Sequence, residues 1–302
     1  LCVMFRAYYV GITQTKILTV NSIVMLLSNV ALNYCLIFGK GGFPAAGIAG
    51  AAIASSVSEA VSLLFFIIYT SMTADKRKYG FRRAFTLRPH LLKGMLSISG
   101  WTMVQSFISV SIWFIFFLAI EHLGERPLAV TNIVRNISAL LIMVISAFAT
   151  TAGALISNQI GAGEQRCLFK TCGMTLKLTY AILIPLLIIL CLFPESVLRA
   201  FTDSPSLIAA SVNSVYVMAS STLIMAPSFI LFNAVSGTGN TRAGFIMEMI
   251  SLAVYTAVIY YGIIRLKPDV ALCWFSEHVY GVTLIFLAWW YLKSGKWRGK
   301  KV

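Results

Sequence analysis

Residues 128–157 read LAVTNIVRNISALLIMVISAFATTAGALIS, and Arg135 is the single charged side chain in this run. The hydrocarbon core of a bilayer requires about 20 apolar residues in a helix, at about 1.5 Å per residue. A membrane β-strand needs only about 9–11 residues, in which apolar and polar side chains alternate. The run is far longer than such a strand and does not alternate, so it predicts a membrane-spanning helix.

Similar runs lie on both sides of this segment, at 17–38, 45–70, 96–120, 172–193, 206–236, 243–264 and 270–292. Residues 1–12 resemble the tail of one more helix. The chain is 59% hydrophobic and only 11% charged, whereas soluble domains carry roughly 25% charged residues. This composition excludes a soluble enzyme, and it also excludes a disordered chain, which requires low hydrophobicity. We expect an all-α polytopic membrane protein.

The net charge of +14 indicates nucleic-acid binding in a soluble protein, but in a membrane protein the position of Lys and Arg sets orientation. One set of alternate segments, with Arg6, holds 18 of the 24 basic residues: 11–16, 71–95, 158–177, 237–242 and the C-terminal tail. The opposite loops hold five. We therefore expect the first set and the C-terminus to be cytoplasmic, and no nucleic-acid partner.

Two loops have similar sequences, GITQTK at Gly11–Lys16 and GTGNTR at Gly237–Arg242. Each precedes an apolar run, and the two runs are six spans apart, so they have the same orientation. This spacing favours two six-helix bundles related as a parallel repeat, with the first bundle incomplete and roughly 130 residues expected before Leu1. The predicted division is the end of an N-terminal lobe (1–70), a basic cytoplasmic linker (71–95) and a C-terminal lobe (96–302).

Several motifs resemble the multidrug and toxic compound extrusion (MATE) family. LNY at 32–34 and GFPAAGIAGAA at 42–52 are similar to that family's passage from the fifth to the sixth helix. SNQIGAG at 157–163 resembles the end of the eighth helix, and SGTGNTR at 236–242 the loop between the tenth and eleventh helices. The resemblance implies secondary active efflux of amphipathic, often cationic, organic molecules by antiport with sodium ions or protons, through a rocker-switch of two lobes.

The chain departs from the family pattern at the coupling site. Some members carry an acidic residue within the seventh and tenth helices, but the interiors of 96–120 and 206–236 have none. Glu121 lies at the outer end of the first run, and Met225 and Ala226 lie near the expected position in the second. Other members use an acidic residue in a first helix that this sequence does not include. The coupling residue therefore cannot be transferred from the family.

Acidic residues inside membrane spans are costly and are candidates for function by default. Glu59, Glu248 and Glu277 lie well inside predicted spans, and we expect them to bind the coupling cation or proton. A carboxyl group in a low-dielectric site can hold a proton, a sodium ion or a cationic drug, but only one at a time, and that competition is antiport. The alternative for these residues is a structural ion pair or a helix-end hydrogen bond. Arg135 either extends to the outer interface or serves the site.

Polar residues recur at helical spacing on several spans, and such stripes avoid lipid. They either form interhelical hydrogen bonds or face a cavity. From these stripes we predict the following substrate-cavity residues: Gln105, Ser109, Asn132, Asn136, Asn213, Tyr216 and Tyr255.

Other functions fit less well. A flippase for lipid-linked oligosaccharide or another lipid-like substrate requires a strongly cationic cavity, yet most basic residues lie in loops and Arg135 is the only one in the interior of a span. An enzyme requires a catalytic constellation, and His90, His122 and His278 lie on different elements. A receptor that transports nothing is a third alternative.

We expect no enzymatic activity, no metal site and no cofactor except the coupling ion. The expected protein is a monomer in the bacterial cytoplasmic (inner) membrane that takes a small amphipathic substrate.

Overall fold

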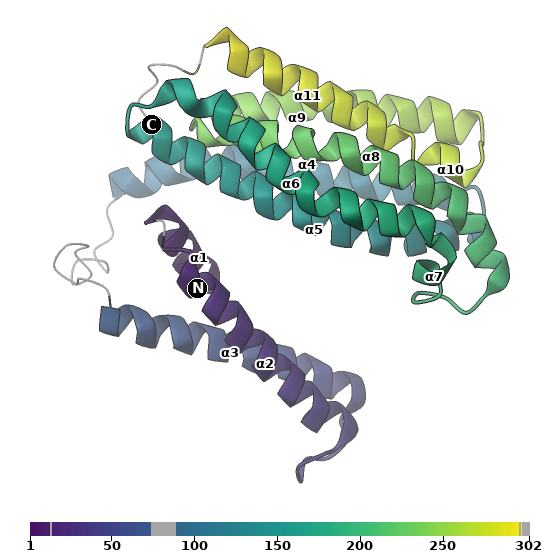
Figure 1. The fold of residues 1–302 in the computed structure, drawn as a ribbon, viewed down its shortest axis with the longest axis horizontal. Coiled ribbons are helices and arrows are strands. Elements are labelled where there is room, and N and C mark those ends of the chain that lie inside the picture. Colours follow the sequence, from purple (N-terminus) through teal and green to yellow (C-terminus); the bar gives the residue numbers. More distant parts are fainter. Residues whose placement is uncertain (13, 74–88, 296, 298–302) are drawn as a thin grey trace. The chain divides into compact units, whose positions relative to one another are not determined.

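The computed structural model describes residues 1–12, 14–73, 89–295 and 297, and these contain helices and no strand. Eight helical segments in this part of the chain are long and apolar enough to cross a membrane, at the eight positions predicted from the sequence. The prediction of an all-α polytopic membrane protein is confirmed. The chain divides into two compact units, Leu1–Arg88 and Pro89–Val302, and the ribbon of each is drawn in Figure 1.

The N-terminal unit contains three helices, α1 (Cys2–Gly11), α2 (Lys16–Phe38) and α3 (Gly47–Thr73). Helices α2 and α3 approach closely at Gly50, where an added Cβ would lie 2.5 Å from the backbone oxygen of Leu36. Gly50 is thus a small residue that lets the two helices approach. A buried hydrogen bond of 2.8 Å from the Asn21 side-chain amide to the Ser62 hydroxyl also joins the two helices.

The C-terminal unit is a bundle whose helices pack side by side in Figure 1. Its elements are α4 (Pro89–Glu121), α5 (Glu125–Gly161), the short 3₁₀ turn η2 (Gln165–Cys167), α6 (Leu168–Leu192), α7 (Pro194–Leu198), α8 (Pro205–Gly237), α9 (Thr241–Val258), η3 (Ile259–Arg265), α10 (Val270–Cys273) and α11 (Ser276–Ser294).

Helices α5 and α8 form the most extensive contact in this bundle. They meet at two glycines: a Cβ on Gly153 would lie 2.9 Å from the Asn233 oxygen, and a Cβ on Gly237 would lie 2.5 Å from the Gly153 oxygen. In lipid, such small residues allow backbones to approach, and van der Waals packing then stabilises the pair. Gly237 therefore both ends α8 and forms its contact with α5. Gly239, at φ 78°, supplies the left-handed turn that follows.

Two of the predicted spans are not continuous α-helices. The span expected over 243–264 is α9 followed by η3, a π-helical segment of seven residues. The span expected over 270–292 is divided into α10, whose start is capped by the Asp269 side chain, and α11, with residues 274 and 275 between them. As a result, Glu277 lies in the first turn of α11 and not seven residues into a helix.

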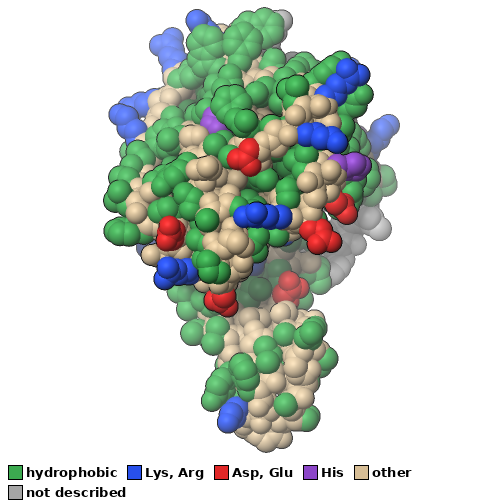
Figure 2. All heavy atoms as spheres, turned by 90° about the vertical axis from the view of Figure 1, so that its right-hand side faces the viewer, with side chains coloured by type: hydrophobic (Ala, Val, Ile, Leu, Met, Phe, Trp, Pro, Cys, Tyr) green, Lys and Arg blue, Asp and Glu red, His purple; other side chains and the backbone are tan. Residues whose placement is uncertain are grey.

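The helix connections alternate between the two ends of this bundle. Figure 2 looks onto the end that carries α7 and α10, where acidic and basic side chains are scattered among hydrophobic ones. The charged residues near this end include five acidic and four basic ones: Glu121, Glu125, Glu195, Asp203, Asp269, Arg126, Arg199, Arg265 and Lys267. Those near the opposite end include one acidic and four basic ones: Glu164, Arg166, Lys170, Arg242 and Lys293. The described bundle is thus more basic at the end predicted to be cytoplasmic. The orientation itself stays a prediction.

The predicted division at 70, 95 and 96 also stays a prediction. Helix α3 ends at Thr73 and α4 begins at Pro89, and most of the predicted basic linker, residues 74–88, lies outside the described residues. The parallel repeat is likewise a prediction. Its two marker loops each follow a helix ending at Gly11 or Gly237, and Thr13 lies outside the described residues.

Candidate functional site

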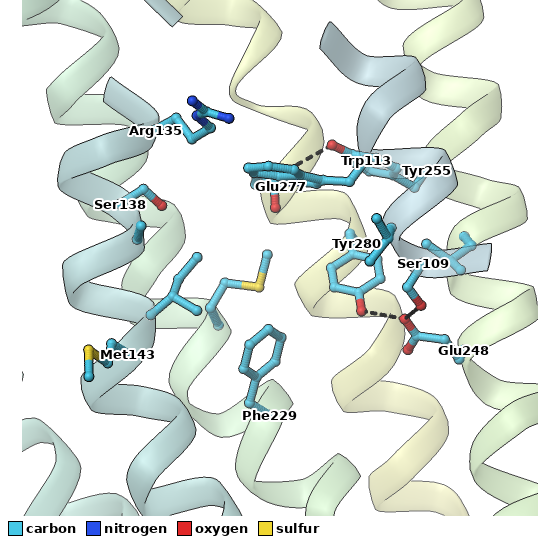
Figure 3. Close-up of a pocket in the computed structure, with 15 residues that line it drawn as sticks. Ser109, Trp113, Arg135, Ser138, Met143, Phe229, Glu248, Tyr255, Glu277 and Tyr280 are labelled. Carbon is cyan, nitrogen blue, oxygen red and sulfur yellow. Dashed lines mark hydrogen bonds between the residues drawn. The ribbon is translucent and has the colours of Figure 1, made fainter. Parts of the chain in front are cut away.

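A cavity of about 470 Å³ lies within the C-terminal unit. Five helices, α4, α5, α8, α9 and α11, line it, and most of the lining is aliphatic, aromatic or Met. Three side chains in the lining carry charge: Arg135, Glu248 and Glu277. Figure 3 shows how these groups lie around the space. Two of the three acidic residues selected from the sequence are therefore brought together on one cavity.

Glu248 is almost fully buried, at 4% exposure, on the second turn of α9. The side chain of Asn240 caps this helix by accepting a hydrogen bond from the backbone nitrogen of Ala243, which fixes where the helix begins. Two hydroxyl groups donate to the same carboxylate oxygen, Oε1: Ser109 Oγ at 2.9 Å and the Tyr280 phenol at 2.9 Å. Three helices thus meet at one carboxylate.

Glu277 receives a hydrogen bond of 2.8 Å from the Tyr255 hydroxyl to its Oε1. Its position in the first turn of α11 places the carboxylate at the positive end of a helix dipole, which favours negative charge there. The break between α10 and α11 is the feature that creates this position, and the apolar sequence around it does not reveal the break.

The two carboxylates and two tyrosines form a crossed arrangement between α9 and α11. Glu248 and Tyr255 lie on α9, Glu277 and Tyr280 lie on α11, and each glutamate accepts from the tyrosine of the other helix. The two phenol rings also meet edge to face, with centroids 5.8 Å apart. Tyr280 is absent from the predicted site, although its spacing of three residues from Glu277 places both on one helix face.

Arg135 lies on α5, and its guanidinium carbon is 5.1 Å from the centroid of the Phe117 ring on α4. Phe117 in turn contacts Trp113 with ring centroids 5.0 Å apart. A cation over an aromatic face is attracted by the ring quadrupole. The arginine that the sequence left between an interfacial and a functional role therefore lines the cavity, and it contacts Phe117, which packs against the lining residue Trp113.

The remaining predicted residues lie elsewhere. Glu59 belongs to the N-terminal unit, where its side chain is exposed on α3 while the neighbouring Ser58 and Ser62 are buried against α2. Of the predicted substrate-cavity residues, Ser109 and Tyr255 line this cavity. The other five do not: Gln105 and Asn132 are half-buried, and Asn136, Asn213 and Tyr216 are exposed. Helical phase explains the difference, since the cavity takes Arg135 and Ser138 of α5 and leaves Asn136 on another face.

The described residues contain no group of three or more His, Cys, Asp or Glu side chains placed to hold a metal ion. The cavity therefore presents two carboxylates, which neutral hydroxyl donors hold in place on an otherwise apolar lining.

The MatE family model matches residues 102–261 of the chain, a segment that includes four of the five helices around the cavity. Among relatives, a protein described as an uncharacterized transporter YisQ of Bacillus subtilis is 25% identical over 83% of this chain and 55% of its own length. A probable multidrug resistance protein NorM of Thermotoga maritima is 25% identical over 99% of this chain and 64% of its own length. The chain thus spans about half to two thirds of the length of these relatives.

Solved structures of MATE transporters share the fold. A variant of the Vibrio cholerae transporter VcmN has a TM-score of 0.82 at 12% identity and covers 97% of this chain and 65% of its own. The transporter ClbM, solved in complex with Rb⁺, has a TM-score of 0.77 at 18% identity and covers 96% of this chain and 64% of its own. The match of the family model over more than half of the sequence, with eight membrane-spanning helices in the same fold, shows that this chain belongs to the MatE family of membrane transporters.

Proposed function

We propose that the transporter containing this chain exports amphipathic, cationic organic compounds from the bacterial cytoplasm by antiport with sodium ions or protons. The observation that carries the proposal is the apolar cavity with two carboxylates, the buried Glu248 and the half-buried Glu277, each held by one or two hydroxyl donors. Its volume of about 470 Å³ falls within the range of about 300–1,000 Å³ that small-molecule pockets occupy.

The chemistry of the lining supports a cationic, amphipathic substrate. Trp113 and Phe229 offer aromatic faces, which attract cations, and Met143 and Met225 offer flexible, polarisable surface that adapts to differently shaped ligands. Burying a charged carboxylate without a countercharge is costly. A bound cation therefore stabilises the ionised pair of carboxylates. That cation must leave before another one binds.

The two carboxylates explain the exchange of ion and substrate. A proton or a sodium ion at Glu248 or Glu277 occupies the same negative charge that attracts the organic cation, so the two ligands compete. We propose that rocking of two lobes alternately opens the site to each side of the membrane. The transporter acts as a monomer in the cytoplasmic membrane with its C-terminus in the cytoplasm, and the solved complex of ClbM with Rb⁺ supports a monovalent cation as a ligand of this fold.

A flippase for lipid-linked oligosaccharide is the second candidate, but no observation favours it. Such a substrate carries phosphate, and the cavity presents two carboxylates against one guanidinium. An anionic substrate is therefore repelled.

The test is efflux of ethidium from cells that express the whole transporter, under imposed sodium or proton gradients. We expect Glu248→Gln and Glu277→Gln each to reduce gradient-driven efflux at least about tenfold, since one countercharge for the ion is lost (about 1.4 kcal/mol per tenfold change). Glu121→Gln is the matched control, because this exposed glutamate ends α4 away from the cavity lining. Wild-type efflux in both cavity variants would exclude the proposal.

A further inference from the structure

We propose that Arg135 determines the charge of the organic cation that the cavity accepts, making the site selective for monovalent over divalent cations. This inference rests on the proposed function. It concerns a residue for which the sequence motifs give no role, and it follows from the charged groups that this chain places around one cavity.

The cavity lining contains two carboxylates, Glu248 and Glu277, and one guanidinium, Arg135. With both glutamates ionised, the charged groups that these helices contribute sum to a single negative charge. One monovalent cation neutralises these groups, whereas a divalent cation exceeds their charge by one, which is unfavourable in an apolar surrounding. Arg135 shifts this balance by one unit whatever other groups face the cavity. Without the arginine, the same site would carry two negative charges and would match a divalent ligand.

The arginine is held on the cavity wall. Its guanidinium carbon lies 5.1 Å from the ring centroid of Phe117, and Phe117 is itself packed against Trp113 and Phe116. Arg135 is half-buried, and the residues beside it, Val134 and Ile137, are buried in the core of the bundle. These contacts hold the positive charge at the cavity wall.

The hydrogen bonds of the glutamates come from neutral groups. Ser109 and Tyr280 donate to Glu248, and Tyr255 donates to Glu277. In Figure 3 the arginine lies on the α5 side of the space, and the two glutamates lie on the α9 and α11 sides. The guanidinium thus acts across the cavity as a fixed countercharge and leaves the carboxylates able to take a ligand.

The test compares two probes of similar shape, 1-methyl-4-phenylpyridinium with one positive charge and methyl viologen with two. Equilibrium binding of each is measured on the same preparation of the whole transporter in detergent, for the wild type, Arg135→Met, Arg135→Gln and Arg135→Lys. We expect the wild type and Arg135→Lys to prefer the monovalent probe. Arg135→Met and Arg135→Gln should shift the ratio of the two dissociation constants toward methyl viologen by about tenfold or more, the scale of one charge interaction across a partly solvated site.

The ratio is insensitive to a fraction of misfolded protein, because both constants come from one preparation. An unchanged ratio in the neutral variants would overturn the inference, and so would an equal shift in Arg135→Lys. Loss of both ligands in one neutral variant, with a wild-type ratio in the other, would also overturn it. A wild type that binds neither probe removes the proposed function itself, and the role of Arg135 falls with it.

Discussion

The contact between α5 and α8 provides a sharp structural prediction, for Gly237→Ala. The added Cβ would lie 2.5 Å from the Gly153 oxygen and 3.2 Å from its carbonyl carbon and Cα. All three are backbone atoms, so no flexible side chain can move aside. To restore an ordinary contact of about 3.5 Å, the helices must separate locally by about 1 Å. Overpacking of this kind costs about 1–3 kcal/mol.

The assay is the free energy of unfolding of the purified transporter in mixed detergent micelles, with thermal unfolding as a second readout. We expect Gly237→Ala to lower it by about 2 kcal/mol. Gly173→Ala is the matched control, because Gly173 is an interior residue of α6 with no atom within 4 Å of an added Cβ. Removing a glycine from a helix there should add about 0.5–1 kcal/mol. Equal stability of Gly237→Ala and the wild type would refute the close approach of α5 and α8.

Two further predictions concern single contacts. Tyr280→Phe removes one of the two hydroxyl donors to Glu248 and should destabilise the protein by about 1–2 kcal/mol in the same unfolding assay. The control Tyr34→Phe, at an exposed position, should have no effect. Equal stability of the two variants would contradict the hydrogen bond. Gly50→Ala places a Cβ 2.5 Å from the backbone oxygen of Leu36 and should lower the free energy of unfolding by about 1–3 kcal/mol. Gly11→Ala, whose added Cβ meets no atom within 4 Å, is the control. Unchanged stability of Gly50→Ala would show that α2 and α3 pack less closely than described.

The spans were predictable because the signal is length and hydropathy. A run such as 128–157 is long and apolar enough that a membrane-spanning helix is its one physical explanation. The eight spans found among the described residues therefore lie where the sequence predicts them. The interruptions were not predictable, since no Pro or Gly marks the break between the four-residue helix α10 and α11. The π-helical segment after Val258 carries no comparable sequence signal.

The candidate site was predictable in its charged residues and less so in its polar ones. Buried carboxylates are rare enough in a membrane span that rarity alone selected Glu248 and Glu277. Polar residues are common on helices that pack together, and the helical phase that directs Ser109 into the cavity and Asn136 away from it is set by tertiary packing. Tyr280 was overlooked because a tyrosine in an apolar run looks like core. Glu59 is exposed on α3 in the other unit, and its role stays a prediction.

In the proposed function, one pair of carboxylates serves both the coupling ion and the organic cation. The most direct measurement is the dissociation constant of 1-methyl-4-phenylpyridinium for the whole transporter as the concentration of sodium ions, and separately of protons, is raised. We predict that one of these ions weakens binding in proportion to its concentration, and that this dependence disappears in the double variant Glu248→Gln, Glu277→Gln. Binding that is independent of both ions in the wild type, or equally dependent in the double variant, would contradict the account.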